Sequence, residues 1–421
     1  MEPAVRHSVV AISLLYEQLP RFSAHLPSDQ DQHRERLILS HYNAAISQLR
    51  PMTSPEKVPL VLVVCILFIG IEMLRSNTHA AIQHCKHGIQ LLANCADYQW
   101  INQHVQPVYR RLSLFPYFFG HRDADYPSLG SLCSPATQPQ PFTSLLDAQC
   151  MMDNIYSRTI RLMRLGDAYR FGKWRNELPA KELLDEQREV NTLLDTWQSL
   201  FSTLQQSSLT PEEKRSQMAC PWLLAARRDK CRIAINMAFE TDETGYDKYL
   251  ETFKRIKRIL GKVASSLYLE NVSSRVSTED THLGTRPVKF TFEMAWTPIV
   301  SFSALKCRDL DTRLGLWRLL PVVGYPRESL WEMSLIIPML GRVIEMEHGL
   351  PLDAIDAMED TGLVNLPPDL QRIKHVWVES APTHMTVNGK TMMGREVGFS
   401  VVGDDGDVHP NVEFLDETGY L

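Results

Sequence analysis

Two pairs of side chains have the spacing at which one turn of helix could hold a metal ion. Glu345 and His348 form an E-x-x-H sequence, which is half of the pattern that binds two iron ions in helical bundles. His84 and His87 are also three residues apart, so a helix would bring both imidazoles near each other. Neither pair brings the further ligands that a metal site needs, and solvated side chains are the simpler interpretation. We expect no metal site at either position.

Short motifs of the common enzyme classes are missing from the sequence. It contains no G-x-S-x-G, no H-E-x-x-H and no G-x-G-x-x-G. Residues 388–391, NGKT, end like a phosphate-binding loop, but position 384 is His where that loop needs Gly. We therefore expect no catalytic residue and no cofactor, and a protein that is not an enzyme. The alternative, an all-α enzyme acting on an apolar substrate, would have to use Glu345 and His348.

One segment, FKRIKRILGK at 253–262, has the pattern of a basic amphipathic helix. Its apolar residues recur at helical spacing, and between them lie Lys254, Arg255, Lys257 and Arg258. A solvated helix face is the default interpretation of such a pattern. The functional alternative is a nuclear import signal or a surface that contacts phosphate groups, which the arginines of residues 158–175 could extend.

The composition indicates a folded protein with no general attraction to polyanions. The chain has 421 residues, 44% of them hydrophobic, and its 44 Lys and Arg against 50 Asp and Glu give a formal charge of -6. Its eight cysteines lie ten or more residues apart, which fits neither a zinc knuckle nor a redox pair. The first residues lack the basic and apolar regions of a secretory signal, so we expect an intracellular protein.

The most apolar stretch, Val58–Ile71, could be a membrane span or a buried helix. A helix rises about 1.5 Å per residue, so this stretch reaches roughly 21 Å and falls short of the ~30 Å apolar core of a bilayer. A buried helix is therefore expected, with Pro59 in its first turn. Ser76 or Asn77 can cap a second helix, in which Gly88 would permit close packing. The two helices are predicted to form a hairpin.

Breaks in the helical pattern divide the chain into four parts. Residues 1–120 are helical in pattern, whereas 121–142 are rich in Pro, Ser, Gly and Gln and predict a loop or linker. Helices resume in 143–365, at 144–165, 180–204, 219–239, 247–267, 288–305, 312–320 and 328–347. In 366–421, β-branched and aromatic residues and the pair Asn388-Gly389 predict a β-hairpin. The acidic end of this part is expected to be a loosely ordered tail.

The predicted fold is all-α: a multi-helix array of packed helical hairpins with a small C-terminal β-hairpin element. The helix pairs have lengths typical of solenoids and bundles, but no fixed period identifies a repeat family. A large packed array of this kind can present surfaces to partners and can enclose a cavity.

Four separated segments resemble the regulatory domain of the fungal-specific transcription factor family, whose members usually begin with a binuclear zinc-cluster motif. HYNAAISQL from His41 is similar to the family's H-Y-x-x-A-I-x-x-L helix, and PFTSLLDAQCMMDNI to the helix after its long loop. PRESLWEMSLII resembles the late E-G-L-W-D/E helix through Glu328 and Trp331, with Ser329 in place of the usual Gly. The hairpin from Val61 is the most specific match. The residues that carry it are Cys65, Phe68, Glu72, Leu74, Arg75, His84, Gly88 and Leu91.

The chain departs from this family at its N-terminus. A binuclear zinc cluster holds two metal ions with six closely spaced cysteines, but no cysteine precedes Cys65. Three explanations stay open: the sequence is a fragment, a segment that binds DNA is missing from it, or the protein acts only through partners. DNA is therefore an expected partner only if a zinc-cluster segment belongs to the natural protein.

The resemblance implies a transcription regulator in the nucleus, and control of a secondary-metabolite gene cluster is one expectation. Such a domain would act through other transcription proteins, as a homodimer or with a small-molecule effector, and would not contact a membrane. The alternative is a helical scaffold or adaptor protein with no role in transcription.

Overall fold

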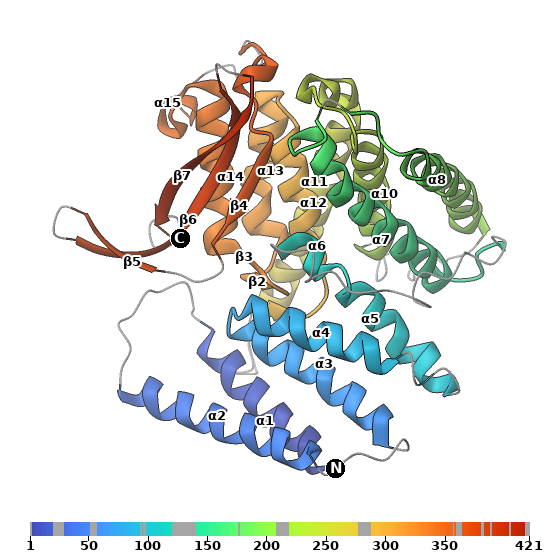
Figure 1. Cartoon of the computed structure of the whole chain (residues 1–421), viewed down its shortest axis with the longest axis vertical. Coiled ribbons are helices and arrows are strands. Elements are labelled where there is room, and N and C mark those ends of the chain that lie inside the picture. Colours follow the sequence, from blue (N-terminus) through green and yellow to red (C-terminus); the bar gives the residue numbers. More distant parts are fainter. Residues whose placement is uncertain are drawn as a thin grey trace.

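The computed structural model of the chain describes residues 2–19, 29–50, 57–92, 95, 98–119, 140–175, 177–207, 219–276, 288–356, 358, 364–379, 383–387, 390–403 and 406–416. Over these residues the chain is mostly helical, and its longer strands lie near the C-terminus (Figure 1). The prediction of a mostly helical fold is confirmed in this coarse form. Most of the predicted loop at 121–142, and the turn Asn388-Gly389, lie outside the described residues.

The N-terminal part is built from helices that pack in pairs. They are α1 (Pro3–Gln18), α2 (Asp29–Leu49), α3 (Val58–Leu74) and α4 (Thr78–Leu92), followed by the π-helical segment Ile101–Val105, α5 (Gln106–Leu112) and α6 (Phe115–Phe119). α1 packs on α2 and α3, and α3 packs on α4. Asn77 caps α4, since its side-chain oxygen accepts from the Ala80 amide at 3.2 Å. The predicted hairpin of α3 and α4 is thus confirmed, and none of the described helices has the length and apolar character of a membrane span.

The longest helices belong to the second helical part. Its elements are α7 (Leu145–Arg170), α8 (Lys181–Ser207), α10 (Ala219–Asn236), the 3-10 segment Glu243–Tyr249, α11 (Leu250–Val276), α12 (Thr297–Lys306), α13 (Leu310–Val323), α14 (Met333–His348) and α15 (Leu352–Asp356). Ser144 and Asp147 form a capping box that begins α7. α7 packs on α8 and α10, and α13 packs on α11, α12 and α14.

Two predicted helices begin later than their periodicity suggests. Residues 288–296 and 328–332 are not helical, and this region forms three short strands, β1 (Phe290–Thr291), β2 (Arg327–Glu328) and β3 (Trp331–Glu332). β2 pairs in parallel with β1 and antiparallel with β3. The Glu328 carboxylate accepts hydrogen bonds from the backbone amides of Ala295 and Thr297. These hydrogen bonds join residues that are distant in the sequence. They, rather than the local periodicity, determine the structure of this region.

The C-terminal β element is larger than the predicted hairpin. Its four strands are β4 (His375–Val378), β5 (Thr383–Val387), β6 (Lys390–Val402) and β7 (Val408–Asp416), and β6 pairs antiparallel with the other three. The prediction of a loosely ordered tail is wrong for 408–416, because these residues pair with 394–402. Pro410 is tolerated because β7 lies at the edge of the sheet. Arg342 of α14 holds β7 through two hydrogen bonds of 2.6 and 3.0 Å to Glu413.

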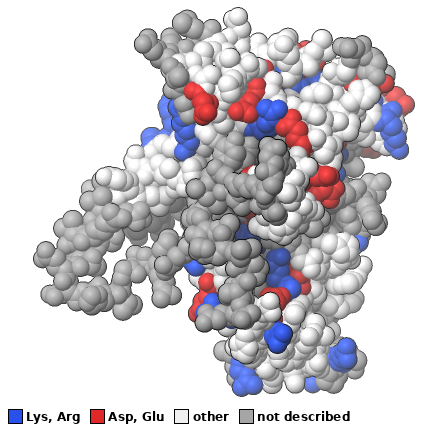
Figure 2. Space-filling view, turned by 90° about the vertical axis from the view of Figure 1, so that its left-hand side faces the viewer, with Lys and Arg blue, Asp and Glu red and all other residues white. Residues whose placement is uncertain are grey.

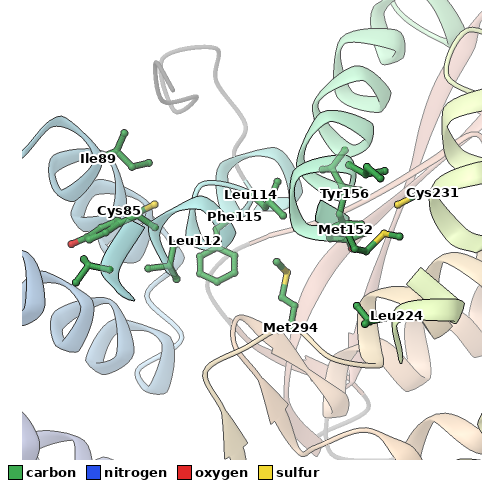
Figure 3. Close-up of a cluster of buried hydrophobic side chains, with 14 of the residues drawn as sticks. Cys85, Ile89, Leu112, Leu114, Phe115, Met152, Tyr156, Leu224, Cys231 and Met294 are labelled. Carbon is green, nitrogen blue, oxygen red and sulfur yellow. The ribbon is translucent and has the colours of Figure 1, made fainter. Parts of the chain in front are cut away.

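Both helical parts contribute to one hydrophobic core. Figure 3 shows Cys85 of α4 and Met152 of α7 on opposite sides of it, with Phe115 between them. Trp197 anchors α8 in the same core, because its ring is fully buried and its indole N–H donates to the Ala148 carbonyl at 2.8 Å. A shared core of this kind fixes the N-terminal hairpins against α7 and α10.

Candidate functional site

A cavity lies where α7, α10 and α12 meet the start of β4. Its volume is about 220 Å³, and a hollow of about 190 Å³ adjoins it. The residues that line both are Phe118, Arg164, Leu305, Trp331, His375 and Val376. A cavity of ~150 Å³ inside a protein can hold a benzene molecule, so this space is large enough for a small organic ligand.

Aromatic side chains form part of the cavity wall. Phe118 of α6 meets Trp331 edge to face with 5.7 Å between the ring centroids, and Phe119 meets the same indole ring at 5.3 Å. Phe302 of α12 and Ile160 of α7 also line the cavity. These side chains suit the apolar body of a ligand.

Basic side chains form most of the charged lining of the cavity. They are Arg164, Arg170, Lys230, Lys306 and Lys374. Among the described residues, Asp167 is the acidic residue that lines the cavity, and the adjoining hollow adds Glu332 and Glu379 with Arg395. Asp167 pairs with both arginines, Lys306 lies 2.8 Å from Glu243, and Lys374 pairs with Asp369. The cavity lining therefore holds more basic than acidic side chains, but most of its cations are paired with a nearby carboxylate.

Lys230 is held inside this lining by neutral groups. Its ammonium group donates to the Tyr156 hydroxyl at 2.8 Å and to the Pro298 carbonyl at 3.0 Å. It also lies 5.0 to 5.5 Å from the centroids of three rings, Phe118, Tyr156 and Phe302, where cation–π attraction contributes. Burial disfavours the charged form and lowers the pKa of Lys230 to about 7.

Three further lining residues carry buried polar atoms that lack a partner among the described residues, and one of them is Trp331 through its indole N–H. Arg170 bonds Asp167 through Nη2, but its Nε and Nη1 atoms have no hydrogen-bond partner. The Ser301 hydroxyl of α12 also has none, and this side chain is 2% exposed. Buried donors without partners are costly, at about 1–3 kcal/mol each, so such groups gain from a polar ligand.

A buried network of charges holds Lys306 in position. Glu243 lies 2.8 Å from Lys306 and 3.0 Å from Arg308, and Arg308 in turn pairs with Glu347 at 3.0 Å. Arg313 lies 2.7 Å from the same Glu347 carboxylate. Burial opposes the charge on Glu347, but the two arginines outweigh it and lower its pKa to about 2. Burial lowers the pKa of Lys306 to about 8 despite the attraction of Glu243.

Residues predicted from the family pattern of the N-terminal hairpin meet one another rather than the cavity. The Tyr42 hydroxyl lies 2.9 Å from His84 Nε2, and Phe68 packs against both rings, at 4.9 Å from Tyr42 and 5.5 Å from His84. Burial and the neighbouring Glu72 carboxylate raise the pKa of Tyr42. The expectation of a solvated histidine is wrong for His84, which is half-buried, whereas His87 is exposed.

The other predicted residues of this hairpin serve packing and one ion pair. Cys65 is buried in the core, and Arg75 lies 2.8 Å from the Glu35 carboxylate. At Gly88 a Cβ atom would lie 2.2 Å from the Tyr109 ring. The prediction that Gly88 permits close helix packing is therefore confirmed.

The late segment of the family pattern does reach the cavity. Trp331 lines it, whereas the buried Glu328 carboxylate accepts from the Thr297 amide and hydroxyl and so ties β2 to the start of α12. Ser329 between them has a φ of 53°, a left-handed conformation that glycine adopts more readily than serine. This is the position at which the sequence departs from the pattern.

The predicted basic patch is largely neutralised by carboxylates. Arg255 makes two hydrogen bonds of 2.6 Å to Asp229, and Lys257 lies 2.9 Å from Asp311. Lys254 lies 3.1 Å from Glu251, and Arg258 donates to the Lys254 carbonyl at 3.4 Å. Described basic and acidic side chains also lie beside one another on the face in Figure 2. These contacts favour a structural role over phosphate binding.

The E-x-x-H pair on α14 forms no metal site that the structure reveals. Glu345 bonds Arg342 and accepts from the Leu352 amide, whereas both nitrogens of His348 lack a hydrogen-bond partner among the residues that the structure describes. His348 is half-buried, not solvated as expected, and burial lowers its pKa to about 4. Within the described part of the chain, no three His, Cys, Asp or Glu side chains are arranged to hold a metal ion.

Sequence reasoning did not single out Lys230, Lys306 or Ser301 of the cavity. Of these three residues, Lys230 is the one that the sequence marks most clearly as buried. It stands next to Cys231 in a helical segment with apolar residues before and after it. No protein-family model, curated protein or solved structure matches the chain. Its functional interpretation therefore depends on its own residues.

Proposed function

We propose that the chain is the helical regulatory domain of a transcription regulator and that it resembles the fungal-specific transcription factor family. In this proposal the helical parts form an array of packed hairpins that presents surfaces to other transcription proteins. DNA contact would come from those partners or from a zinc-cluster segment of a longer protein. Its site of action would be the nucleus, and its targets a set of secondary-metabolite genes.

The observation that carries this proposal is the contact among Tyr42, Phe68 and His84. These residues come from three different helices, α2, α3 and α4, and all three belong to the family pattern. If the resemblance arose by chance, there would be no reason to expect these residues to be in contact. Their contact inside the protein supports the interpretation that the matched residues belong to a core that the family shares.

The geometry at Ser329 supports the same proposal independently. The family pattern usually has glycine here, and a φ of 53° is what glycine permits at low cost. The flanking Glu328 and Trp331, which match the pattern, are buried or half-buried at the junction between α12 and the cavity. The segment thus has a backbone conformation that suits glycine at this position.

Transcript profiling tests the proposal in the organism that encodes the chain. Deleting its gene should change the transcripts of a limited, clustered set of genes, and reintroducing the chain should restore them. As a control, a variant with a disrupted core, Trp197→Asp, should fail to restore them. Unchanged transcripts together with exclusion of the tagged protein from the nucleus would instead favour the helical scaffold or adaptor.

A further inference from the structure

We propose that the cavity between α7, α10, α12 and β4 binds a small organic carboxylate with an aromatic body. This goes beyond a role in transcription, because it concerns binding by the chain alone. If the proposed function holds, the carboxylate would be its effector.

The charge of the lining selects an anion. Lys230 forms no ion pair with a carboxylate among the described residues, and Arg170 keeps two nitrogens without a partner. Lys306 lies in the same lining, held by Glu243. A carboxylate that enters the cavity would therefore lie among cationic side chains, of which Lys230 has no acidic partner among the described residues.

The shape and the remaining lining select an apolar, ring-containing body. Phe118, Phe302 and Trp331 offer ring faces and edges, and Ile160 and Leu305 lie with them. A bare inorganic anion would leave this surface uncovered, whereas an aromatic acid would cover it and place its charge near Lys230. The combined space of the cavity and the adjoining hollow accommodates a fused two-ring molecule.

The walls around the cavity are suited to hold such a ligand without rearrangement. Lys306 is fixed by Glu243, which is itself fixed by Arg308. Lys230 is fixed by Tyr156 and Pro298. Ordered donors lose little conformational entropy on binding, which favours affinity for a small molecule.

Calorimetric titration of the full chain with 2-naphthoate, and with the neutral 2-naphthamide, tests this inference. We expect 2-naphthoate to bind at one site and 2-naphthamide at least tenfold more weakly. Inorganic phosphate should not displace 2-naphthoate at comparable concentrations. Equal affinity for the acid and the amide, or no binding of the acid by the folded protein, would overturn the inference.

Two variants and a control locate the site. Lys230→Met should weaken binding of 2-naphthoate at least tenfold, and Ser301→Leu, which adds bulk to the lining, should abolish it. The control is Arg188→Gln, since Arg188 is an exposed residue of α8 that pairs with Asp185 away from the lining. Circular dichroism checks that each variant is folded. An unchanged affinity in folded Ser301→Leu contradicts the proposed location even if Lys230→Met does not fold.

Discussion

Arg308 and Glu347 face one another in the interior of the protein, with both side chains fully buried. Two hydrogen bonds of 3.0 and 3.1 Å join the guanidinium to the carboxylate. Arg313 shares the same carboxylate, and Arg308 also pairs with Glu243. The pair links α14 to the chain segment after α12 and lies beside Glu243, which pairs with the cavity residue Lys306.

Substituting Glu347→Gln should therefore destabilise the protein strongly. It leaves Arg308 and Arg313 without their shared carboxylate, and breaking a buried pair from one side costs about 3–5 kcal/mol. Urea unfolding followed by circular dichroism measures the change. Glu413→Gln is the matched control, because it breaks the partly exposed pair with Arg342 and should cost no more than about 1 kcal/mol. Similar losses of unfolding free energy in the two variants would show that the buried network contributes no more to stability than the partly exposed pair.

Substituting Ser329→Gly should stabilise the protein, by about 1 kcal/mol. Glycine removes the strain of a φ of 53°, which costs an ordinary residue roughly 1–2 kcal/mol, and removes a buried hydroxyl that lacks a partner. The greater freedom of glycine in the unfolded chain offsets part of this gain. Ser329→Ala separates the two effects, since it removes the hydroxyl but keeps the strain. A destabilised glycine variant in thermal unfolding would contradict the explanation.

Substituting Gly88→Ala should destabilise the protein by about 1–3 kcal/mol, because the new methyl group would overlap the buried Tyr109 ring. Alanine is otherwise the better helix former by about 1 kcal/mol. Gly261→Ala in α11 is the matched control, since a Cβ atom there meets no other atom within 4 Å. That variant should be neutral or slightly more stable. Equal effects at the two glycines would exclude the steric explanation.

Much of the helical fold is predictable from sequence because its signals are local. The length of the apolar stretch at Val58 and the capping residue Asn77 identify the α3–α4 hairpin. By contrast, β2 and β3 depend on Glu328, whose partners on Ala295 and Thr297 lie about thirty residues away in the chain. Contacts at such separation leave no periodic signal in a single sequence.

The cavity escapes prediction for the same reason. Its basic residues come from α7, α10, α12 and the segment before β4, and no two of these segments are joined by a motif. The acidic, turn-rich composition of residues 408–416 predicts a loosely ordered tail, yet Val412 and Phe414 pair with β6. The alternating apolar residues of this segment indicate a strand, but the prolines and glycines near them indicate turns.

Binding of 2-naphthoate should weaken as the pH rises from 6 to 8. Lys230, with a pKa of about 7, loses its charge in this range, and Lys306, with a pKa of about 8, begins to lose its own. Loss of positive charge from the lining disfavours an anion, so the dissociation constant should rise by up to about tenfold. Titration calorimetry at pH 6, 7 and 8 measures this.

The other charged or titratable groups around Lys230 are Arg227, Cys231, Tyr156 and Glu328, and burial raises the pKa of Tyr156, Cys231 and Glu328. Tyr156 and Cys231 are therefore expected to stay neutral over this pH range, and His375, with a pKa lowered to about 4 by burial, is also neutral. Lys230→Met should reduce the slope with pH. A pH-independent affinity of the unmodified protein would rule out titration of these lysines in binding.

Association with chromatin tests the proposed role in transcription most directly. The tagged chain would be crosslinked in living cells of its own organism, and the DNA recovered with it would be sequenced. The proposal predicts enrichment at the promoters of the same clustered genes whose transcripts respond to its deletion, whether DNA is contacted by this chain or by partners. A profile no different from that of an untagged strain would contradict it.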